Sequence, residues 1–236
     1  MTIWLTRPEA DSIALAGALG AAGIDTLIAP VVRIAPRAVT LTEKPDAILL
    51  TSRHAAHALP AEWRDLPVFC VGMATADAAR AHGYSAITHG TSDALHLLPH
   101  ITDQMSAGQR LLYLSGEDTR HDISRLLAAN DIAVTREVAY EAISETTFPP
   151  ALREALANHS ISGVVFFSPR SAMLACGLLK QEEFTASAPT IDAYCLSLPV
   201  AEAAGELPWR SLHVCHLPNR EAMLAMVVAH AQAVAS

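Results

Sequence analysis

The chain has 236 residues, of which 51% are apolar and 17% are charged, so it can bury substantial cores and lacks the composition of a disordered protein. Its formal net charge of −8 argues against a dedicated nucleic-acid binder, which normally carries an excess of Lys and Arg. No apolar stretch approaches the roughly 20 residues of a membrane helix, and the N-terminus resembles no signal peptide, so we expect a cytoplasmic protein without a membrane partner.

Short apolar runs alternate with amphipathic stretches from the N-terminus onward. Thr2–Thr6 predicts a strand, and Pro8 then opens a helix that Gly23 ends. Ile24–Ala29 predicts the next strand. Later apolar runs that predict strands are 47–50, 68–71, 111–114, 164–167, 191–196 and 212–215. Asn219 caps a long closing helix. Strands that alternate with helices predict an α/β protein with parallel sheets covered on both faces.

Two extended segments, Val31–Val39 and Arg136–Ile143, interrupt this alternation. They indicate that one lobe is inserted into another. We predict an outer α/β lobe from residues 1–30 plus 145–236, an inserted α/β lobe from 38–138, and linker strands at 31–37 and 139–144. The linker strands could pair as an antiparallel ribbon and act as a hinge. The alternative is a single eight-stranded βα barrel, which gives no reason for two long extended connectors.

The cysteines and most histidines favour structural roles. The four cysteines have apolar neighbours and no C-x-x-C spacing, which predicts buried, reduced thiols; they are Cys70, Cys176, Cys195 and Cys215. Two histidine pairs could each share a helix face but lack a third ligand; they are His54 with His57 and His96 with His100. His213 and Cys215 share one face of a strand. We therefore predict no metal site.

Several common motifs are absent from the chain. No G-x-G-x-x-G follows a strand, and neither G-x-x-x-x-G-K-[ST] nor G-x-S-x-G occurs. Their absence argues against the usual nicotinamide-binding, P-loop and α/β-hydrolase proteins.

An internal repeat relates Ile48–Ala55 (ILLTSRHA) to Val165–Ala172 (VFFSPRSA). In both, a hydroxyl residue ends an apolar strand and an Arg follows two positions later, where a helix begins. Ligands of open parallel sheets bind beyond the carboxyl ends of the strands, and helix N-termini attract anions. The candidate anion-binding residues are Thr51, Ser52 and Arg53 in one lobe, Ser168, Arg170 and Ser171 in the other, and Thr75 near a third helix start. Ordinary helix caps with exposed arginines are the alternative.

Tyr140 lies in the second extended segment. It is either a β-favouring residue of the linker or a phenol that faces a cleft between the lobes. In the second case it could hydrogen-bond to a leaving oxygen and donate a proton to it.

These residues lie in segments that resemble the uroporphyrinogen-III synthase family over nearly the full chain. The matching segments are WLTRPEADSIALAGALGAAGIDTLIAPVVRIAP, DAILLTSRHAAHAL, VFCVGMATADAARAHG, RLLYLSGEDTRHDISRLLAANDIAVTREVAYEA and GVVFFSPRSAMLA. The resemblance implies two parallel-sheet α/β lobes (HemD-like, flavodoxin-like) joined by a two-stranded linker.

The resemblance also implies a reaction that needs no cofactor. The linear tetrapyrrole hydroxymethylbilane loses water from its terminal hydroxymethyl group, and the resulting azafulvene is attacked by the substituted carbon of ring D. The spiro intermediate fragments and recloses, which inverts ring D and gives uroporphyrinogen III. We expect a monomer that takes its substrate from the preceding bilane-forming enzyme.

Residue by residue, the family's cleft hydroxyls correspond to Thr51, Ser52, Thr75 and Ser168, and its linker tyrosine to Tyr140, which is expected to assist departure of the hydroxyl. In the returning lobe the family often carries an I-G-P-T-T-A-like turn. Here the stretch reads LSLPVA, and Ser197 takes the glycine position. Ser197 is therefore expected to replace the contacts of the missing threonines.

Two other functions fit the same residues. A non-catalytic two-lobe protein that binds a polyanionic small molecule would share the cleft. A structural or regulatory α/β module would use Tyr140 and the hydroxyl residues only for packing and capping.

Overall fold

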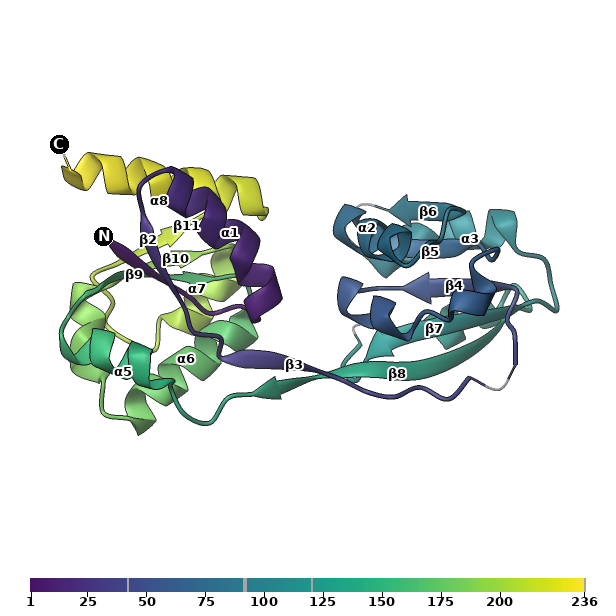
Figure 1. Cartoon of the computed structure of the whole chain (residues 1–236), viewed down its shortest axis with the longest axis horizontal. Helices are drawn as coiled ribbons and strands as arrows, with labels where there is room; N and C mark the ends of the chain where they lie inside the picture. The colour runs from purple at the N-terminus through teal and green to yellow at the C-terminus, as the bar shows by residue number, and fades with distance from the viewer. Residues whose placement is uncertain (42, 91–92, 120, 236) are drawn as a thin grey trace. The chain divides into compact units, whose positions relative to one another are not determined.

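The chain divides into two compact units, seen in a computed structural model that describes residues 1–41, 43–90, 93–119 and 121–235. Unit 1 comprises Met1–Arg33 and Ile143–Ser236, and unit 2 comprises Ile34–Ala142 (Figure 1). Each unit contains its own open sheet. The predicted fold of two parallel-sheet α/β lobes is thus confirmed, and the single barrel is excluded.

Unit 1 has a five-stranded sheet in the order β11-β10-β9-β1-β2, with parallel pairings throughout. Its strands are β1 (Thr2–Leu5), β2 (Asp25–Ile28), β9 (Ile161–Phe166), β10 (Asp192–Cys195) and β11 (Ser211–Val214). Its helices are α1 (Glu9–Ala21), α5 (Pro150–Ala157), α6 (Pro169–Gln181), α7 (Leu198–Ala204) and α8 (Arg220–Ala235), with a 3₁₀ helix η4 (Thr185–Thr190). Numbered within the unit, the strand order is 2-1-3-4-5, which is the flavodoxin-like order.

The three central strands of unit 1, β1, β9 and β10, are buried on both faces because helices cover both. α1 and α8 lie on one side of the sheet and α5 and α6 on the other (Figure 1). Ile3, Leu5 and Tyr194 belong to the core beneath α1 and α8. Trp4 points the opposite way, as the period of two in a strand requires, and its ring meets Phe148 edge-on.

Unit 2 has a six-stranded sheet in the order β3-β8-β7-β4-β5-β6. Its strands are β3 (Val32–Pro36), β4 (Ala47–Leu50), β5 (Val68–Val71), β6 (Ile87–Gly90), β7 (Arg110–Gly116) and β8 (Ala133–Ser144). Its α-helices are α2 (Met73–Ala81), α3 (Leu98–Gln104) and α4 (Ile123–Ala128), and its 3₁₀ helices are η1 (Arg53–Ala58), η2 (Ala61–Trp63) and η3 (Ala94–Leu97).

The parallel strands of unit 2 follow the order 3-2-1-4-5, in which the chain reverses direction across the sheet between β4 and β7. Such a switch point leaves a crevice outside the carboxyl ends of the two strands. The sheet again carries two cores. Ile48 and Leu50 face the core beneath α2 and η1, whereas Leu49 and Tyr113 face the core beneath η3, α3 and α4.

Strands β3 and β8 form the antiparallel ribbon through which the chain passes between the units. The Arg37 amide donates to the Ala139 carbonyl at 2.7 Å, and the Glu145 amide donates to the Val31 carbonyl at 2.9 Å. Residue numbers rise along β3 while those of the partners in or just after β8 fall, so the two strands are antiparallel. The second linker segment is not separate from the sheet, because it is the end of the twelve-residue strand β8.

The four cysteines are free and buried, as predicted. Burial raises the pKa of the Cys70 thiol to about 12 and that of Cys176 to about 11, so both stay protonated at neutral pH. Within the described residues, no helix combines the length and the apolar character that crossing a bilayer requires.

Candidate functional site

A pocket of about 330 Å³ opens at the switch point of unit 2. It is lined by Thr51, Val71, Asp93, Ala94, Tyr113, Asp118, Thr119, His121, Ile123 and Tyr140. Small-molecule pockets range from about 300 to 1,000 Å³, so this one accommodates a group the size of one substituted ring. Among the residues predicted from sequence, Thr51 and Tyr140 line this pocket.

Tyr140 reaches the pocket because of an irregularity in β8. Ser115 of β7 pairs with Val138, whereas Gly116 pairs with Tyr140, so Ala139 is an extra residue. A bulge of this kind redirects the side chains that follow it. The Tyr140 ring packs on the apolar core beneath η1 and meets the His54 ring edge-on at 5.7 Å between centroids.

Gly116 makes room for that ring. A Cβ built on Gly116 would lie 2.7 Å from Cζ and 2.9 Å from the hydroxyl oxygen of Tyr140. Both distances are shorter than real Cβ contacts. Any larger residue at position 116 would therefore displace the phenol.

Arg136 fixes the backbone around this glycine. Its guanidinium donates to the Ser115 hydroxyl at 2.8 Å, the Gly116 carbonyl at 2.8 Å and the Glu117 carbonyl at 2.6 Å. The Glu117 amide in turn donates to the Tyr140 carbonyl at 3.1 Å. These bonds hold the end of β7 against the bulged part of β8.

A second phenol lies beside Thr51. The Tyr113 hydroxyl and Thr51 Oγ1 are 3.2 Å apart and hydrogen-bonded. Leu49 pairs with Tyr113 in the register of β4 and β7, and Thr51 follows Leu49 by two positions, so its side chain points to the same face. Burial raises the pKa of Tyr113, which keeps its hydroxyl protonated and able to donate.

Two acidic residues of the pocket lining, Asp93 and Asp118, form what we call the acidic wall. The Asp93 carboxylate accepts the Leu95 amide at 2.9 Å, capping η3, and contacts His121 Nε2 at 3.2 Å. The bond from the Leu95 amide is the main cause that lowers the pKa of Asp93, so the carboxylate is ionised at neutral pH. Asp118 also lines the pocket and is exposed.

The other residues predicted in this unit lie beside the pocket and do not line it. Ser52 is the N-cap of η1, where its hydroxyl accepts the His54 amide at 3.3 Å, and Arg53 is the first residue of that helix. The predicted helix start at Arg53 is thus confirmed, and the helix is a 3₁₀ helix of six residues. Thr75 lies in the first turn of α2 and is only 4% exposed.

The residues predicted in the other lobe all lie in unit 1, at the carboxyl ends of β9 and β10. Ser168 caps α6, accepting the Ser171 amide at 3.1 Å and bonding to the Ser171 hydroxyl at 2.9 Å. Arg170 donates to Ser144 Oγ at 3.4 Å. Ser197 is the N-cap residue of α7, but its side chain makes no capping bond.

The internal repeat aligns Thr51 with Ser168, but the helix caps are Ser52 and Ser168. Relative to the aligned repeat, η1 therefore begins one residue later than α6 does. The arginines consequently occupy different positions, since Arg53 begins η1 and Arg170 is the second residue of α6.

Five polar residues that line the pocket were not predicted from the sequence: Asp93, Tyr113, Asp118, Thr119 and His121. Tyr113 could have been noticed as the one polar-tipped side chain in the apolar run LLYL. The others follow strands or precede short helices without a shared motif, and only the fold brings them together.

Comparisons with known proteins agree with this architecture. The family model HEM4, Uroporphyrinogen-III synthase HemD, matches residues 13–225. The solved uroporphyrinogen-III synthetase from Helicobacter pylori 26695 is similar at a TM-score of 0.63 and 16% identity, over 97% of this chain and 98% of that chain. A mutant uroporphyrinogen III synthase from the extremely thermophilic bacterium Thermus thermophilus is similar at a TM-score of 0.52 and 15% identity, over 98% of this chain and 99% of that chain. No curated protein matches this chain significantly.

Proposed function

Because this chain belongs to the uroporphyrinogen-III synthase family, we propose that the pocket beside Tyr140 binds the hydroxymethyl end of the linear substrate and promotes its dehydration. The family's enzymes are cyclising lyases that close hydroxymethylbilane with inversion of ring D, and this is the activity of the chain. The observation that supports the assignment of the site is that Tyr140 and Thr51 line one pocket at a switch point.

Tyr140 is the proposed proton donor. As the carbon–oxygen bond of the hydroxymethyl group breaks, the phenol gives its proton to the departing oxygen, which leaves as water. The pyrrole nitrogen supplies the electron pair, so the ring becomes an azafulvene cation. Ring D then attacks the exocyclic carbon, and the proton released when the pyrrole re-forms after reclosure returns to the phenolate. Thr51, whose hydroxyl is hydrogen-bonded to that of Tyr113, is the proposed hydrogen-bond partner for the same end of the substrate.

The acidic wall fits the cation better than it fits the substrate's carboxylate arms. The Asp93 carboxylate and the Asp118 side chain would repel acetate and propionate groups, but they would attract the positive charge that develops on the ring. We therefore place the hydroxymethyl-bearing ring in the pocket and the carboxylate arms outside it. The proposed donors to these arms are Ser52, Arg53 and the region of Thr75 in unit 2, and Ser168, Arg170, Ser171 and Ser197 in unit 1.

The experiment that tests this function is a product analysis. The purified chain is added to freshly made hydroxymethylbilane, and the porphyrin isomers are separated after oxidation. The unassisted reaction closes without inversion to isomer I, so rapid formation of isomer III supports the proposal. A non-catalytic binding protein would leave isomer I as the product, and a structural module would not slow or redirect closure at all.

Removal of either arginine is expected to weaken substrate binding more than folding. Arg53→Ala or Arg170→Ala should raise KM about fivefold, since a partly exposed contact to a carboxylate is worth on the order of 1 kcal/mol. The effect should shrink as salt rises, because exposed ion pairs are screened. Arg125→Ala, on the exposed side of α4, is the matched control. An unchanged KM with a lower Tm would assign these arginines to structure alone.

Neutralising the acidic wall is expected to slow the chemical step. Asp93→Asn keeps the cap of η3, because Asn caps helices as well as Asp does, but it removes the charge. The loss should be about fivefold in kcat, the effect of roughly 1 kcal/mol between unit charges about 4 Å apart in water. Asp103→Asn, exposed on α3, controls for net charge. A faster Asp93→Asn enzyme would instead indicate that Asp93 repels a substrate carboxylate.

We also propose that the enzyme works as a cytoplasmic monomer that receives hydroxymethylbilane from the bilane-forming enzyme. The support is chemical, since a substrate that closes by itself to isomer I is best transferred before it escapes. Sedimentation of the chain alone and with that enzyme would measure both the oligomeric state and the complex. A stable dimer would contradict the first point.

A further inference from the structure

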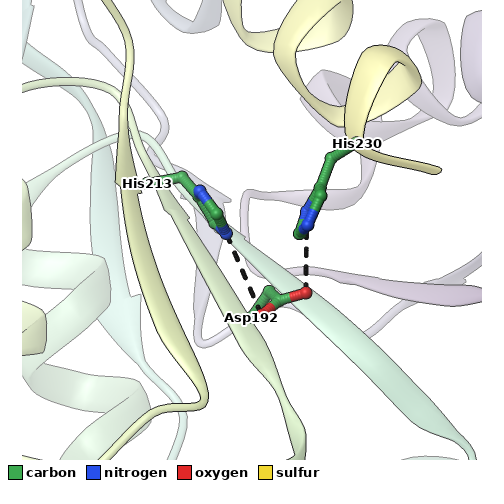
Figure 2. Close-up of side chains that lie close together, drawn as sticks. All are labelled: Asp192, His213 and His230. Carbon is green, nitrogen blue, oxygen red and sulfur yellow. Dashed lines mark ion pairs between the residues drawn. The ribbon is translucent and has the colours of Figure 1, made fainter. Parts of the chain in front are cut away.

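Three side chains that can bind a metal converge in unit 1, on the face of the sheet that α8 covers. They are Asp192 from β10, His213 from β11 and His230 from α8 (Figure 2). His213 Nε2 lies 3.9 Å from Asp192 Oδ1, and His230 Nδ1 lies 3.6 Å from Asp192 Oδ2. One ligand atom from each residue lies within 4.8 Å of the other two.

The fold builds this cluster from residues far apart in sequence. Asp192 begins β10, and Tyr194 follows it on the same face. The register pairs Tyr194 with His213, whose ring stacks on the phenol at 5.1 Å between centroids. His230 comes seven residues after the buried Met223 of α8, and therefore lies on the helix face that packs on the sheet.

One atom of the cluster lacks the partner that burial normally requires. Among the buried side-chain nitrogen and oxygen atoms of the described residues, only His213 Nε2 makes no hydrogen bond. Buried polar atoms are almost always paired, and an exception needs an explanation. This nitrogen faces Asp192, as Figure 2 shows, so a bound cation would satisfy it.

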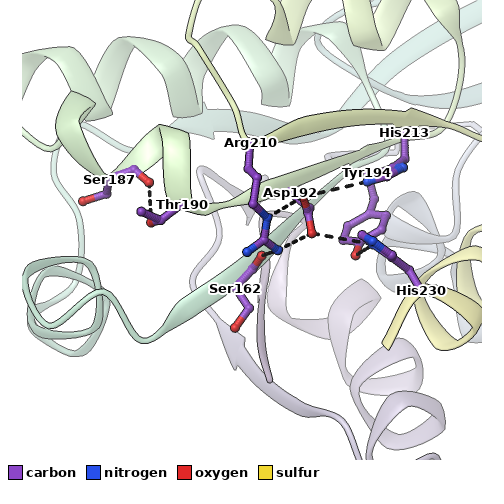
Figure 3. A network of polar contacts seen from close by, with 8 residues as sticks. All are labelled: Ser162, Ser187, Thr190, Asp192, Tyr194, Arg210, His213 and His230. Atoms are coloured by element: carbon purple, nitrogen blue, oxygen red, sulfur yellow. Dashed lines mark hydrogen bonds and ion pairs between the residues drawn. The ribbon is translucent and has the colours of Figure 1, made fainter. Parts of the chain in front are cut away.

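Asp192 is ready to act as a ligand because Arg210 orients it. The Asp192 side chain is only 2% exposed, and the Arg210 guanidinium binds both of its oxygens (Figure 3). The same guanidinium donates to the Ser162 carbonyl at 3.3 Å. A carboxylate has about four lone-pair positions, and Arg210 uses two of them. Outer donors of this kind commonly hold a metal-binding carboxylate in place.

We infer that Asp192, His213 and His230 form a binding site for a divalent transition-metal ion of the Zn²⁺ class. Two imidazole nitrogens and one carboxylate oxygen suit Zn²⁺ better than Ca²⁺ or Mg²⁺, which prefer oxygen. Tetrahedral Zn²⁺ with bonds of about 2.1 Å places its ligand atoms about 3.4 Å apart. The separations of 3.6 and 3.9 Å join the two imidazoles to different oxygens of Asp192, and one ligand atom from each residue lies within 4.8 Å of the other two. An ion bound to all three would therefore draw these side chains closer together.

Tyr194 and Arg210, which lie beside the three ligands, affect how the site would bind an ion. The Tyr194 hydroxyl lies 2.6 Å from His230 Nδ1, so it must turn aside or bind the ion when this nitrogen does. Both imidazoles are 29% exposed, which lets the ion enter and lets water complete the coordination. The positive charge of Arg210 beside Asp192 lowers the affinity for a cation relative to a site whose neighbours are all anionic.

The bound ion would stabilise the fold and take no part in the reaction. Asp192 lies at the amino end of β10, whereas Ser197 follows the carboxyl end of the same strand. The site would join α8 to β10 and β11. An ion that binds only the folded chain raises its stability by mass action.

The test uses the tag-free, full-length chain and Zn²⁺ alone. Calorimetric titration should give one site per chain, and Zn²⁺ should raise Tm by several degrees while kcat stays the same with or without chelator. His213→Gln and His230→Gln should each lower the affinity at least tenfold and abolish the rise in Tm. His216→Gln, exposed just beyond β11, is the matched control and should bind as the original does.

A readout on the unaltered chain keeps the test valid if a variant does not fold. Zn²⁺ should protect His213 and His230 from diethyl pyrocarbonate, mapped by mass spectrometry, and should leave His216 reactive. Co²⁺ should give the strong visible absorption of a tetrahedral site. Absence of binding, binding that the His213 and His230 variants retain, or protection of His216 alone would each overturn the inference.

Discussion

Tyr140→Phe is expected to lower kcat by about 10² while leaving isomer III as the main product. The phenol O–H can donate to the leaving oxygen, whereas phenylalanine keeps the ring and removes only the donor. General-acid assistance is worth about 10²–10⁴ in rate. The low end of this range applies because the substrate's hydroxymethyl group also loses its hydroxyl unaided, and the pyrrole nitrogen stabilises the azafulvene cation that forms. The measurements are kcat and the isomer ratio, with the fold verified by circular dichroism.

Tyr84→Phe is the matched control for this change. Tyr84 belongs to the same unit, is buried, and donates its hydroxyl to the Pro60 carbonyl at 2.7 Å, but it does not line the pocket. Its removal should cost about 1 kcal/mol of stability and leave kcat unchanged. A kcat for Tyr140→Phe equal to that of the original chain would remove Tyr140 from the mechanism. Slow formation of mostly isomer I would mean that the phenol controls the inversion.

Gly116→Ala is also expected to reduce kcat, on the order of tenfold or more. It does so although it alters no reactive group. The new Cβ would lie 2.7 Å from the Tyr140 ring, so the ring must leave its place over β7. A displacement of about 1 Å in a catalytic group can cost on the order of 10² in rate. The measurement is kcat together with Tm, because overpacking also costs about 1–3 kcal/mol of stability.

Two comparisons separate displacement of the phenol from general destabilisation. Gly177→Ala on α6 meets nothing within 4 Å and should retain full activity. The double variant Gly116→Ala with Tyr140→Phe should be little slower than Tyr140→Phe alone. The reason is that Gly116→Ala lowers kcat by displacing the Tyr140 hydroxyl, which Tyr140→Phe has already removed. Multiplicative losses in the double variant would contradict this mechanism.

Hydrophobic patterning was sufficient to predict the architecture. The apolar runs at Ala47–Leu50 and Val68–Val71 coincide with β4 and β5, and the caps at Pro8 and Asn219 lie where α1 and α8 begin. These features depend on the burial of apolar side chains and on local backbone chemistry, and both are encoded within a few residues. The extended segments at 31–39 and 136–143 likewise predicted a linker because they break the alternation.

The candidate site depended on features that no short segment encodes. Sequence reasoning placed Tyr140 and Thr51 together only through a family resemblance. It missed Tyr113 and the acidic wall, and it paired His213 only with Cys215, its neighbour on one strand face.

Local pattern along the chain was enough to assign strands and helices, to divide them between two α/β units, and to find the hydroxyl residues that end the strands. Which of those strand ends meet is a property of the folded chain. The strand order brings Thr51 beside Tyr113 across 62 residues, and the bulge at Ala139 turns Tyr140 toward them. Parallel strands must be joined by long crossovers, so neighbours across a sheet are distant in sequence, and their meeting follows from global packing and not from local pattern.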